Sequence, residues 1–342
     1  MICRTRMFIC MWLLGLFFIL AGCGGSRTGA LPADSLQATP LDLTGTVSTI
    51  AGTAANFNLP VGITSDGSSL YIADCNNNKI RKIDIATGIV STVAGTGELG
   101  TTDDSPGTLA RFNNPRGITT DGTWLYVTEM VGNIRKVRIS TGMVTTMATS
   151  TTLSAPTGIT IAGSNLYVTD SVDHIIQKIV ISSGAVTTLA GSTAGWADGT
   201  GTAAKFNQPV GITTDGSQLY VNDFGNSTIR RIDIASHVVT TLAGSPGLTG
   251  GDNGIGATAR FTNPAMGIAT DGTHLYVSDS GNHTIRSIDI SSGAVTTLAG
   301  STAGFADGSG AKAQFRYPEG ITSDGKSLFI SDSSNNAIRR LN

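Results

Sequence analysis

The chain has 342 residues, a formal net charge of −2 and only 13% charged residues. Lysines and arginines form no basic stripe, which disfavours nucleic-acid binding because contacts to phosphates need clustered positive charge. The length is enough for a domain with a large buried core. The 44 glycines and the abundant threonines are as expected for sheets buried between neighbouring sheets.

Residues 1–22 resemble a secretory signal peptide of the bacterial lipoprotein type. Arg4 and Arg6 precede an apolar run over residues 7–20, and a small-residue stretch leads to Cys23. We expect cleavage before Cys23 and acylation of this residue, with ~0.8 kcal/mol of membrane affinity per buried CH₂. A transmembrane anchor is the alternative, but about 14 apolar residues are fewer than the ~20 that span a bilayer.

This signal predicts an extracytoplasmic protein that is lipid-anchored in a bacterial cell envelope. Gly24 follows the cysteine, which favours the outer membrane if the host has two membranes. Residues 23–45 are rich in Gly, Ser, Thr and Pro without periodicity, and this composition predicts a flexible tether. Loss of Arg4 and Arg6 with the signal changes the net charge from −2 to −4.

Residues 46–342 repeat one unit of four short strands, separated by turn residues that tolerate a positive φ. Short connections require neighbouring strands to be antiparallel. Gly-Ile marks the first strand at Gly62, Gly117, Gly158, Gly211, Gly267 and Gly320. A valine marks the fourth strand at Val47, Val90, Val144, Val186, Val239 and Val295.

Four strands per unit and intervals of 41 to 56 residues between the Gly-Ile marks predict an all-β, six-bladed propeller. The repeat begins with a fourth-type strand at residues 47–51 and ends with a third-type strand before Asn342. Pairing of these two strands closes the last blade with the N-terminal strand and leaves no open edge at the seam. Loss of residues 47–52 is therefore expected to open the ring.

The start of the third strand, residues 281–286 (GNHTIR), resembles the NHL repeat, and residues 300–321 are similar to the linker between NHL blades of bacterial proteins. The resemblance covers all six units and implies a propeller. It leaves the function open, because NHL propellers include binding modules, sensor domains and a few lyases.

Two charged positions recur and are interpreted as structural. An acid ends the second strand at Asp74, Glu129, Asp170, Asp223, Asp279 and Asp332. The third strand supplies its predicted partner at Arg81, Arg135, Gln177, Arg230, Arg286 and Arg339. Because nearly every blade has the pair, we predict ion pairs and turn contacts rather than a metal funnel. Asp198 and Asp307 in the joins lack the series of oxygen ligands that calcium needs.

Strand direction places the second-to-third turns and the joins between blades on one face, here called the linker face. We expect five of the six joins to be long, and elaborated loops on one face usually carry binding. Trp196 and Phe305 occupy equivalent positions in two joins, where packing is the interpretation and an exposed contact is the alternative. Cys75 lies in a turn that takes a small residue, and an accessible thiol is the alternative.

Histidines test an enzymatic reading, because the NHL resemblance implies lyases that use histidine with a metal. His174 and His283 lie in turns of the linker face, and His237 and His274 lie on the opposite face. Two histidines on one face are fewer than the three protein ligands usual for catalytic zinc. The sequence therefore predicts neither a metal nor a cofactor, and it gives both linker-face histidines a structural role with binding as the alternative.

The residues before each Gly-Ile mark stand at the mouth of the predicted central channel and differ between blades: Val61, Arg116, Thr157, Val210, Met266 and Glu319. Such positions are free to make specific contacts, and Arg116 and Glu319 could pair or hold two ends of a polar ligand. The candidate binding residues are thus Arg116, Glu319, Met266, Trp196, His174 and His283.

These features predict a binding or scaffold module that recognises a protein, peptide or glycan through the linker face. The alternative is a metal-dependent lyase or lactone hydrolase with its site at the channel mouth. A structural envelope protein without a small ligand is a third reading.

Overall fold

The computed structural model of the chain describes residues 40–148 and 153–342. The predicted signal peptide, Cys23, most of the predicted tether and residues 149–152 lie outside the described residues. Among the described residues, no helix is long and apolar enough to cross a membrane. The helices are single 3₁₀ turns: η1 (Thr53–Ala55), η2 (Cys75–Asn77), η3 (Gly201–Ala203), η4 (Phe224–Asn226), η5 (Gly256–Thr258), η6 (Ser280–Asn282), η7 (Gly310–Lys312) and η8 (Ser333–Asn335).

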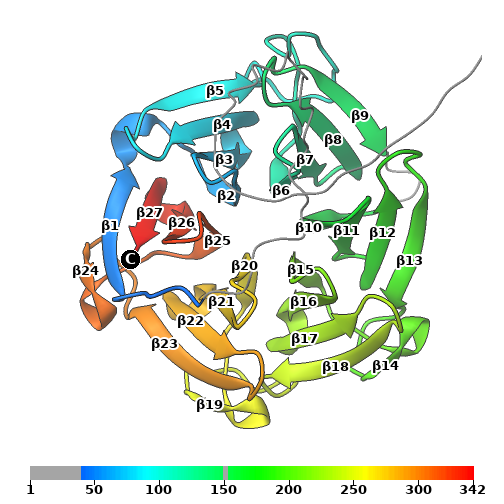
Figure 1. The fold of residues 1–342 in the computed structure, drawn as a ribbon, viewed down its shortest axis with the longest axis vertical. Helices are drawn as coiled ribbons and strands as arrows, with labels where there is room; N and C mark the ends of the chain where they lie inside the picture. Colours follow the sequence, from blue (N-terminus) through cyan, green and yellow to red (C-terminus); the bar gives the residue numbers. More distant parts are fainter. Residues whose placement is uncertain (1–39, 149–152) are drawn as a thin grey trace, which may run out of the picture. The chain divides into compact units, whose positions relative to one another are not determined.

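Six antiparallel sheets surround a central axis as the blades of a propeller (Figure 1), which confirms the predicted fold. From the axis outward, blade 1 holds β2 (Pro60–Ser65), β3 (Ser69–Asp74), β4 (Lys79–Asp84) and β5 (Val90–Ala94). Blade 2 holds β6 (Pro115–Thr120), β7 (Trp124–Glu129), β8 (Asn133–Arg138) and β9 (Val144–Ala148). Blade 3 holds β10 (Pro156–Ala162), β11 (Asn165–Asp170), β12 (Ile175–Val180) and β13 (Val186–Gly191).

The remaining three blades repeat this order. Blade 4 holds β15 (Pro209–Thr214), β16 (Gln218–Asp223), β17 (Thr228–Asp233) and β18 (Val238–Ala243). Blade 5 holds β20 (Pro264–Thr270), β21 (His274–Asp279), β22 (Thr284–Asp289) and β23 (Ala294–Gly300). Blade 6 holds β25 (Pro318–Ser323), β26 (Leu328–Asp332), β27 (Ala337–Leu341) and, as its outer strand, β1 (Thr46–Ala51).

The two ends of the repeat close the ring. β1 pairs antiparallel with β27, with Val47 opposite Leu341 and Thr49 opposite Arg339. The backbones of Thr46 and Asn342 exchange two further hydrogen bonds of 3.1 and 2.9 Å. The predicted closure of the last blade by the N-terminal strand is therefore confirmed.

The recurring Gly-Ile marks are explained by the closeness of neighbouring inner strands. A Cβ added to Gly62 would lie 2.1 Å from the Arg116 carbonyl oxygen of the next blade. The same contact runs around the ring to Gly320, where a Cβ would lie 2.2 Å from the Val61 carbonyl oxygen. Only glycine fits at this distance, so the residues before the glycines are held in a tight circle around the channel mouth.

The long joins take a path that the sequence did not indicate. Four joins are long, at residues 95–114, 192–208, 244–263 and 301–317, and two are short, so the expectation of five is wrong. The long joins run along the outer edge of the blade that they enter. Their middles add a fifth strand or bridge: β14 (Gly199–Thr200) to β18, β19 (Gly254–Ile255) to β23, β24 (Gly308–Ser309) to β1, and Asp104 to Val144 of β9.

These middles reach the opposite face, since the Gly201 N–H donates to the carbonyl oxygen of His237 in a third-to-fourth turn at 2.9 Å. The joins therefore begin and end on the linker face, as predicted, but their middles extend to the opposite face. Their main structural effect is to cover sheet edges, which would otherwise offer unpaired backbone groups to other chains.

The segment before β1 packs against the propeller, although the sequence assigned it to the tether. Leu41 and Leu43 contact the core shared by blades 5 and 6. The Leu41 N–H donates to Asp271 in the turn between β20 and β21 at 3.0 Å. This turn lies on the face opposite the linker face, so the chain enters the propeller from that side.

Candidate functional site

The linker face is formed by the starts of the inner strands and by the second-to-third turns at residues 75–78, 130–132, 171–174, 224–227, 280–283 and 333–336. The turns rest on the chain that leads into their own inner strand. For example, the Gly225 N–H donates to the Asn207 carbonyl oxygen at 2.8 Å, and the Gly281 N–H donates to that of Thr262 at 3.0 Å. These contacts confirm that the turns and the ends of the joins share one face.

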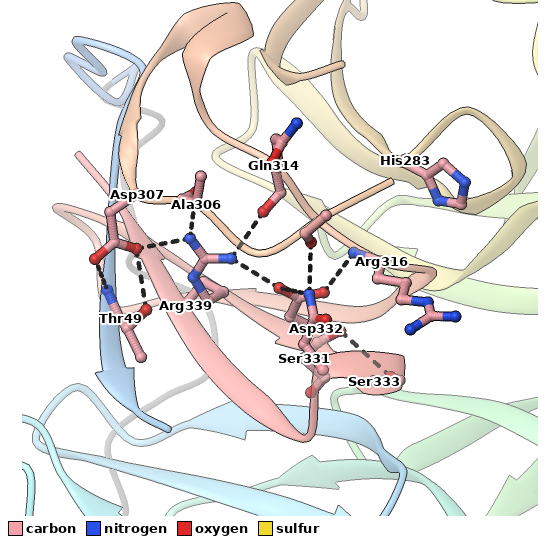
Figure 2. Close-up of polar contacts among 12 residues, drawn as sticks. Thr49, His283, Ala306, Asp307, Gln314, Arg316, Ser331, Asp332, Ser333 and Arg339 are labelled. Atoms are coloured by element: carbon pink, nitrogen blue, oxygen red, sulfur yellow. Dashed lines mark hydrogen bonds and ion pairs between the residues drawn. The ribbon is translucent and has the colours of Figure 1, made fainter. Parts of the chain in front are cut away.

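The recurring acids form buried ion pairs, as Figure 2 shows for blade 6. Arg339 Nη1 lies 2.7 Å from Asp332 Oδ2, and both side chains are fully buried. The Arg316 N–H donates to Asp332 at 2.7 Å. Burial raises the pKa of Asp332, and the hydrogen bonds from Arg316, Asn335 and Arg339 oppose this change.

Equivalent pairs form in four other blades, at Asp74–Arg81, Glu129–Arg135, Asp223–Arg230 and Asp279–Arg286. In the same five blades the guanidinium also stacks on a phenylalanine of the join, at Phe57, Phe112, Phe206, Phe261 and Phe315. Repetition of the same buried contacts in five blades confirms the structural reading of these charges.

The two histidines of the linker face contact the backbone of the next blade. His174 Nδ1 accepts the Gln208 N–H at 3.0 Å, and His283 Nδ1 accepts the Tyr317 N–H at 3.2 Å. The carbonyl oxygens of the Asn78 and Asn336 side chains make the same contact in blades 1 and 6. Burial lowers the pKa of His283, which favours the neutral ring that accepts this hydrogen bond.

Asparagine in blades 1 and 6 thus makes the same contact as histidine in blades 3 and 5. The two histidines belong to different blades, and each contacts the backbone of its own neighbouring blade. Within residues 40–148 and 153–342, no three or more His, Cys, Asp or Glu side chains gather in a way that could hold a metal.

The central channel is narrow, and none of the described residues that line it is charged. It encloses about 110 Å³ and is lined by the Gly-Ile-Thr segments of the inner strands and by Met266. This volume is well below the roughly 300 Å³ at which pockets accommodate drug-sized ligands. A ligand of that size would have to bind at the mouth rather than inside the channel.

At the mouth, Arg116, Glu319 and Cys75 form one charged sector across blades 6, 1 and 2. The charge of Arg116 acts to lower the pKa of Glu319, although no ion pair joins these two side chains in the part of the chain that the structure describes. The Arg116 Nε is buried and has no hydrogen-bond partner among the described residues. Burial raises the pKa of Glu319 to about 7, while Arg116 and the Met266 backbone amide oppose the shift.

Cys75 is 3% exposed, and burial raises the pKa of its thiol. Both properties favour the predicted small turn residue over a reactive thiol. The raised pKa keeps the thiol neutral, and Arg116 and Glu319 are the other ionisable groups of this sector.

Exposed apolar side chains at the turn tips of blades 2 and 3 were missed by the sequence reasoning. Met130, Val131 and Val172 are 42%, 39% and 62% exposed. The position of Val131 and Val172 carries Asn76, Gly225, Gly281 and Ser334 in the other blades, so departure from the repeat was an available signal for these two valines. Trp196 is 63% exposed, and the equivalent Phe305 is 50% exposed while one face of its ring lies 4.8 Å from the Arg339 guanidinium.

The fold and its closure define the class of this protein as a six-bladed β-propeller. Searches of curated proteins show NHL-repeat homologues. SUPPRESSOR OF QUENCHING 1, chloroplastic, of Arabidopsis thaliana is 30% identical over 301 residues, covering 83% of this chain and 25% of that protein. NHL repeat-containing protein 2 of Homo sapiens is 28% identical over 301 residues, covering 83% of this chain and 39% of that protein.

The chain thus spans about a quarter to two fifths of the length of these curated relatives. No protein-family model matches it.

Solved structures agree on the fold. An auxiliary nutrient binding protein from Bacteroides thetaiotaomicron aligns with a TM-score of 0.68 at 19% identity, covering 86% of this chain and 76% of that chain. Virginiamycin B lyase from Staphylococcus aureus aligns with a TM-score of 0.55 at 17% identity, covering 86% of this chain and 98% of that chain. At these identities the likeness concerns the fold alone.

Proposed function

We propose that this chain is a lipid-anchored, extracytoplasmic binding module that recognises a protein, peptide or glycan at the channel mouth on its linker face. The observation that carries the proposal is the pair Arg116 and Glu319. Both lie at one mouth, at positions released from the repeat, and no ion pair joins them among the described residues. An arginine with unused donors beside a carboxyl group is suited to a ligand that presents both an acceptor and a donor.

The surroundings of the mouth support the same reading. Met130, Val131 and Val172 add exposed apolar area on the adjacent turns, and apolar contact beside a few oriented polar groups is typical of recognition sites. The nutrient-binding neighbour is a propeller of the same architecture, which makes a binding role reasonable for this scaffold.

Anchoring rests on the lipoprotein-type signal that ends at Cys23. Acylation there would hold the protein on a membrane of the bacterial cell envelope, the outer one if the host has two. Leu41 meets the propeller on the face opposite the mouth, so a tether arriving from that side leaves the mouth open.

The test is a binding screen of the full chain in detergent against peptides and glycans, comparing wild type with R116E and with R138E. Arg138 is exposed at the end of β8 on the opposite face and serves as the matched charge reversal. We expect at least a tenfold loss of affinity in R116E, since a hydrogen bond to a charged group contributes ~1.5–3 kcal/mol, and none in R138E. Equal effects would contradict a site at the mouth, and chelator-sensitive turnover of a ligand would favour the metal-dependent alternative.

A further inference from the structure

Four blades hold the middle of a long join in the same polar socket on their outer edge. In blade 6, Asp307 Oδ1 lies 2.6 Å from Arg339 Nη2 and 3.0 Å from Thr49 Oγ1, and the Thr49 N–H donates to Asp307 Oδ2 at 3.2 Å (Figure 2). The equivalent side chains in blades 2, 4 and 5 are Asp103, Asp198 and Asn253.

The residue after this acid extends the sheet. Gly308 pairs with Val47, and Asp104 exchanges two backbone hydrogen bonds of 2.8 and 3.3 Å with Val144. The added segment buries the valine that marks the outer strand, so that Val47, Val144, Val239 and Val295 are each at most 2% exposed.

Blade 1 has the arginine and threonine of this socket, which lie on the two outer strands, but its join supplies no acid. Arg81 pairs in register with Thr92, as Arg339 does with Thr49. The short join 52–59 does not reach β5, and within the described residues only β4 pairs with this strand. Val90 is correspondingly only half-buried, and the preceding Ile89 is 66% exposed.

The Arg81 side chain makes fewer hydrogen bonds than its equivalents because the short join supplies no acid. It makes two hydrogen bonds, to Asp74 and to the Ala55 carbonyl oxygen, of which the second is long at 3.4 Å. Arg339 makes four, to Asp332, Asp307 and two join carbonyl oxygens. The Arg81 side chain is 13% exposed, whereas its equivalents Arg135, Arg230, Arg286 and Arg339 are at most 1% exposed.

The backbone of β5 is also oriented for pairing. The Asp84 N–H donates to the carbonyl oxygen of Ile89, so the next pair, Ile83 and Val90, is a non-hydrogen-bonded pair of the ladder. The N–H and C=O groups of Val90 therefore point away from β4. The equivalent Val144 uses these same two groups to bind Asp104.

We propose that the outer edge of blade 1 is a docking site for an extended segment of a partner protein that carries aspartate followed by glycine and serine or threonine. The aspartate would bind Arg81 Nη2 and Thr92, and the next residue would pair with Val90 as an added strand. The occupant is argued from the chain itself, because the blade 4 and blade 6 sockets are filled by Asp198-Gly199-Thr200 and Asp307-Gly308-Ser309.

Blade 3 provides an internal control. Its outer strand β13 also lacks a fifth strand among the described residues, and Val186 is half-buried. Gln177 replaces the arginine there, and it accepts a hydrogen bond from Thr188 at 3.4 Å. This edge therefore offers backbone groups without the positive charge that would select an aspartate.

The experiment measures the anisotropy of a labelled peptide copying residues 303–312 (AGFADGSGAK) with the full chain in detergent. We expect saturable binding, at least tenfold weaker for the peptide in which the residue copied from Asp307 is alanine. V90P removes the outward N–H while the hydrogen bonds to β4 remain, so binding should be lost. V186P on β13 should leave binding unchanged, and T92V should weaken it more than T188V.

Equal binding of the aspartate and alanine peptides, or equal effects of V90P and V186P, would overturn the proposal. If the melting temperature shows that V90P is unfolded, the alanine peptide and the T92V variant still test whether the peptide binds at this edge. Residues 33–35 (Ala-Asp-Ser) offer a competing occupant from this chain. Binding of the peptide only to the D34A variant would assign the site to the chain's own segment and refute a partner.

Discussion

Replacement of Arg339 by leucine tests how strongly the buried charges hold a blade to its join. The change leaves Asp332 fully buried without its cation, and loss of one partner of a buried pair costs about 3–5 kcal/mol. R81L removes the equivalent cation in blade 1 but breaks two hydrogen bonds instead of four. At ~1 kcal/mol for each additional bond, R339L should be the more destabilising by about 2 kcal/mol.

The assay is urea unfolding of the full chain in detergent, with free energies from the two variants compared at one pH. A second change, D332N in the R339L background, should recover part of the loss, because it removes the buried charge that the first substitution leaves unpaired. Equal free energies for R81L and R339L would show that the join contacts of Arg339 add nothing. No recovery with D332N would show that the unpaired carboxylate is not the cause of the loss.

Three further changes test the ring, the mouth and the anchor. G320A should lower the free energy of unfolding by about 1–3 kcal/mol, because the new Cβ would lie 2.2 Å from a backbone oxygen. In G52A the nearest atom to the new Cβ is 3.6 Å away, so this control should be near neutral, and the urea midpoints of the two variants test the difference. Burial raises the pKa of Glu319 from 4.5 to about 7, so the contribution of this residue to the free energy of unfolding falls as pH rises between these values. E319Q should therefore stabilise the protein more at pH ~7.5 than at pH ~5. An equal change in the free energy of unfolding at the two pH values would contradict the shift. C23S should move the protein from the membrane to the soluble fraction and remove acyl mass in intact mass spectrometry, and unchanged fractionation would refute the anchor.

Much of the fold could be predicted because its determinants recur at fixed positions. Each Gly-Ile mark reports a contact between neighbouring inner strands. The closure could be predicted because its two halves lie at the ends of the repeat, where the missing fourth strand of one end matches the spare strand of the other. The path of the joins could not be predicted in this way. It depends on pairs such as Asp307 with Arg339, 32 residues apart. This spacing recurs at 32 or 33 residues in blades 2, 4 and 5, but the spacing alone does not show that the join follows the outer sheet edge.

The same distinction separates the two candidate sites. Arg116 and Glu319 were found from the sequence because they depart from the repeat at their own positions. Val131 and Val172 depart in the same way, and comparison of turn tips between blades would have found them. Arg81 does not depart at all: the sequence shows the same arginine in five blades, and what differs is the acid that a longer join would have supplied. This difference is visible only when the hydrogen-bond partners of the equivalent arginines are compared in space. In a repeat protein, the segment bound in the other blades then indicates what the outer edge of blade 1 should bind.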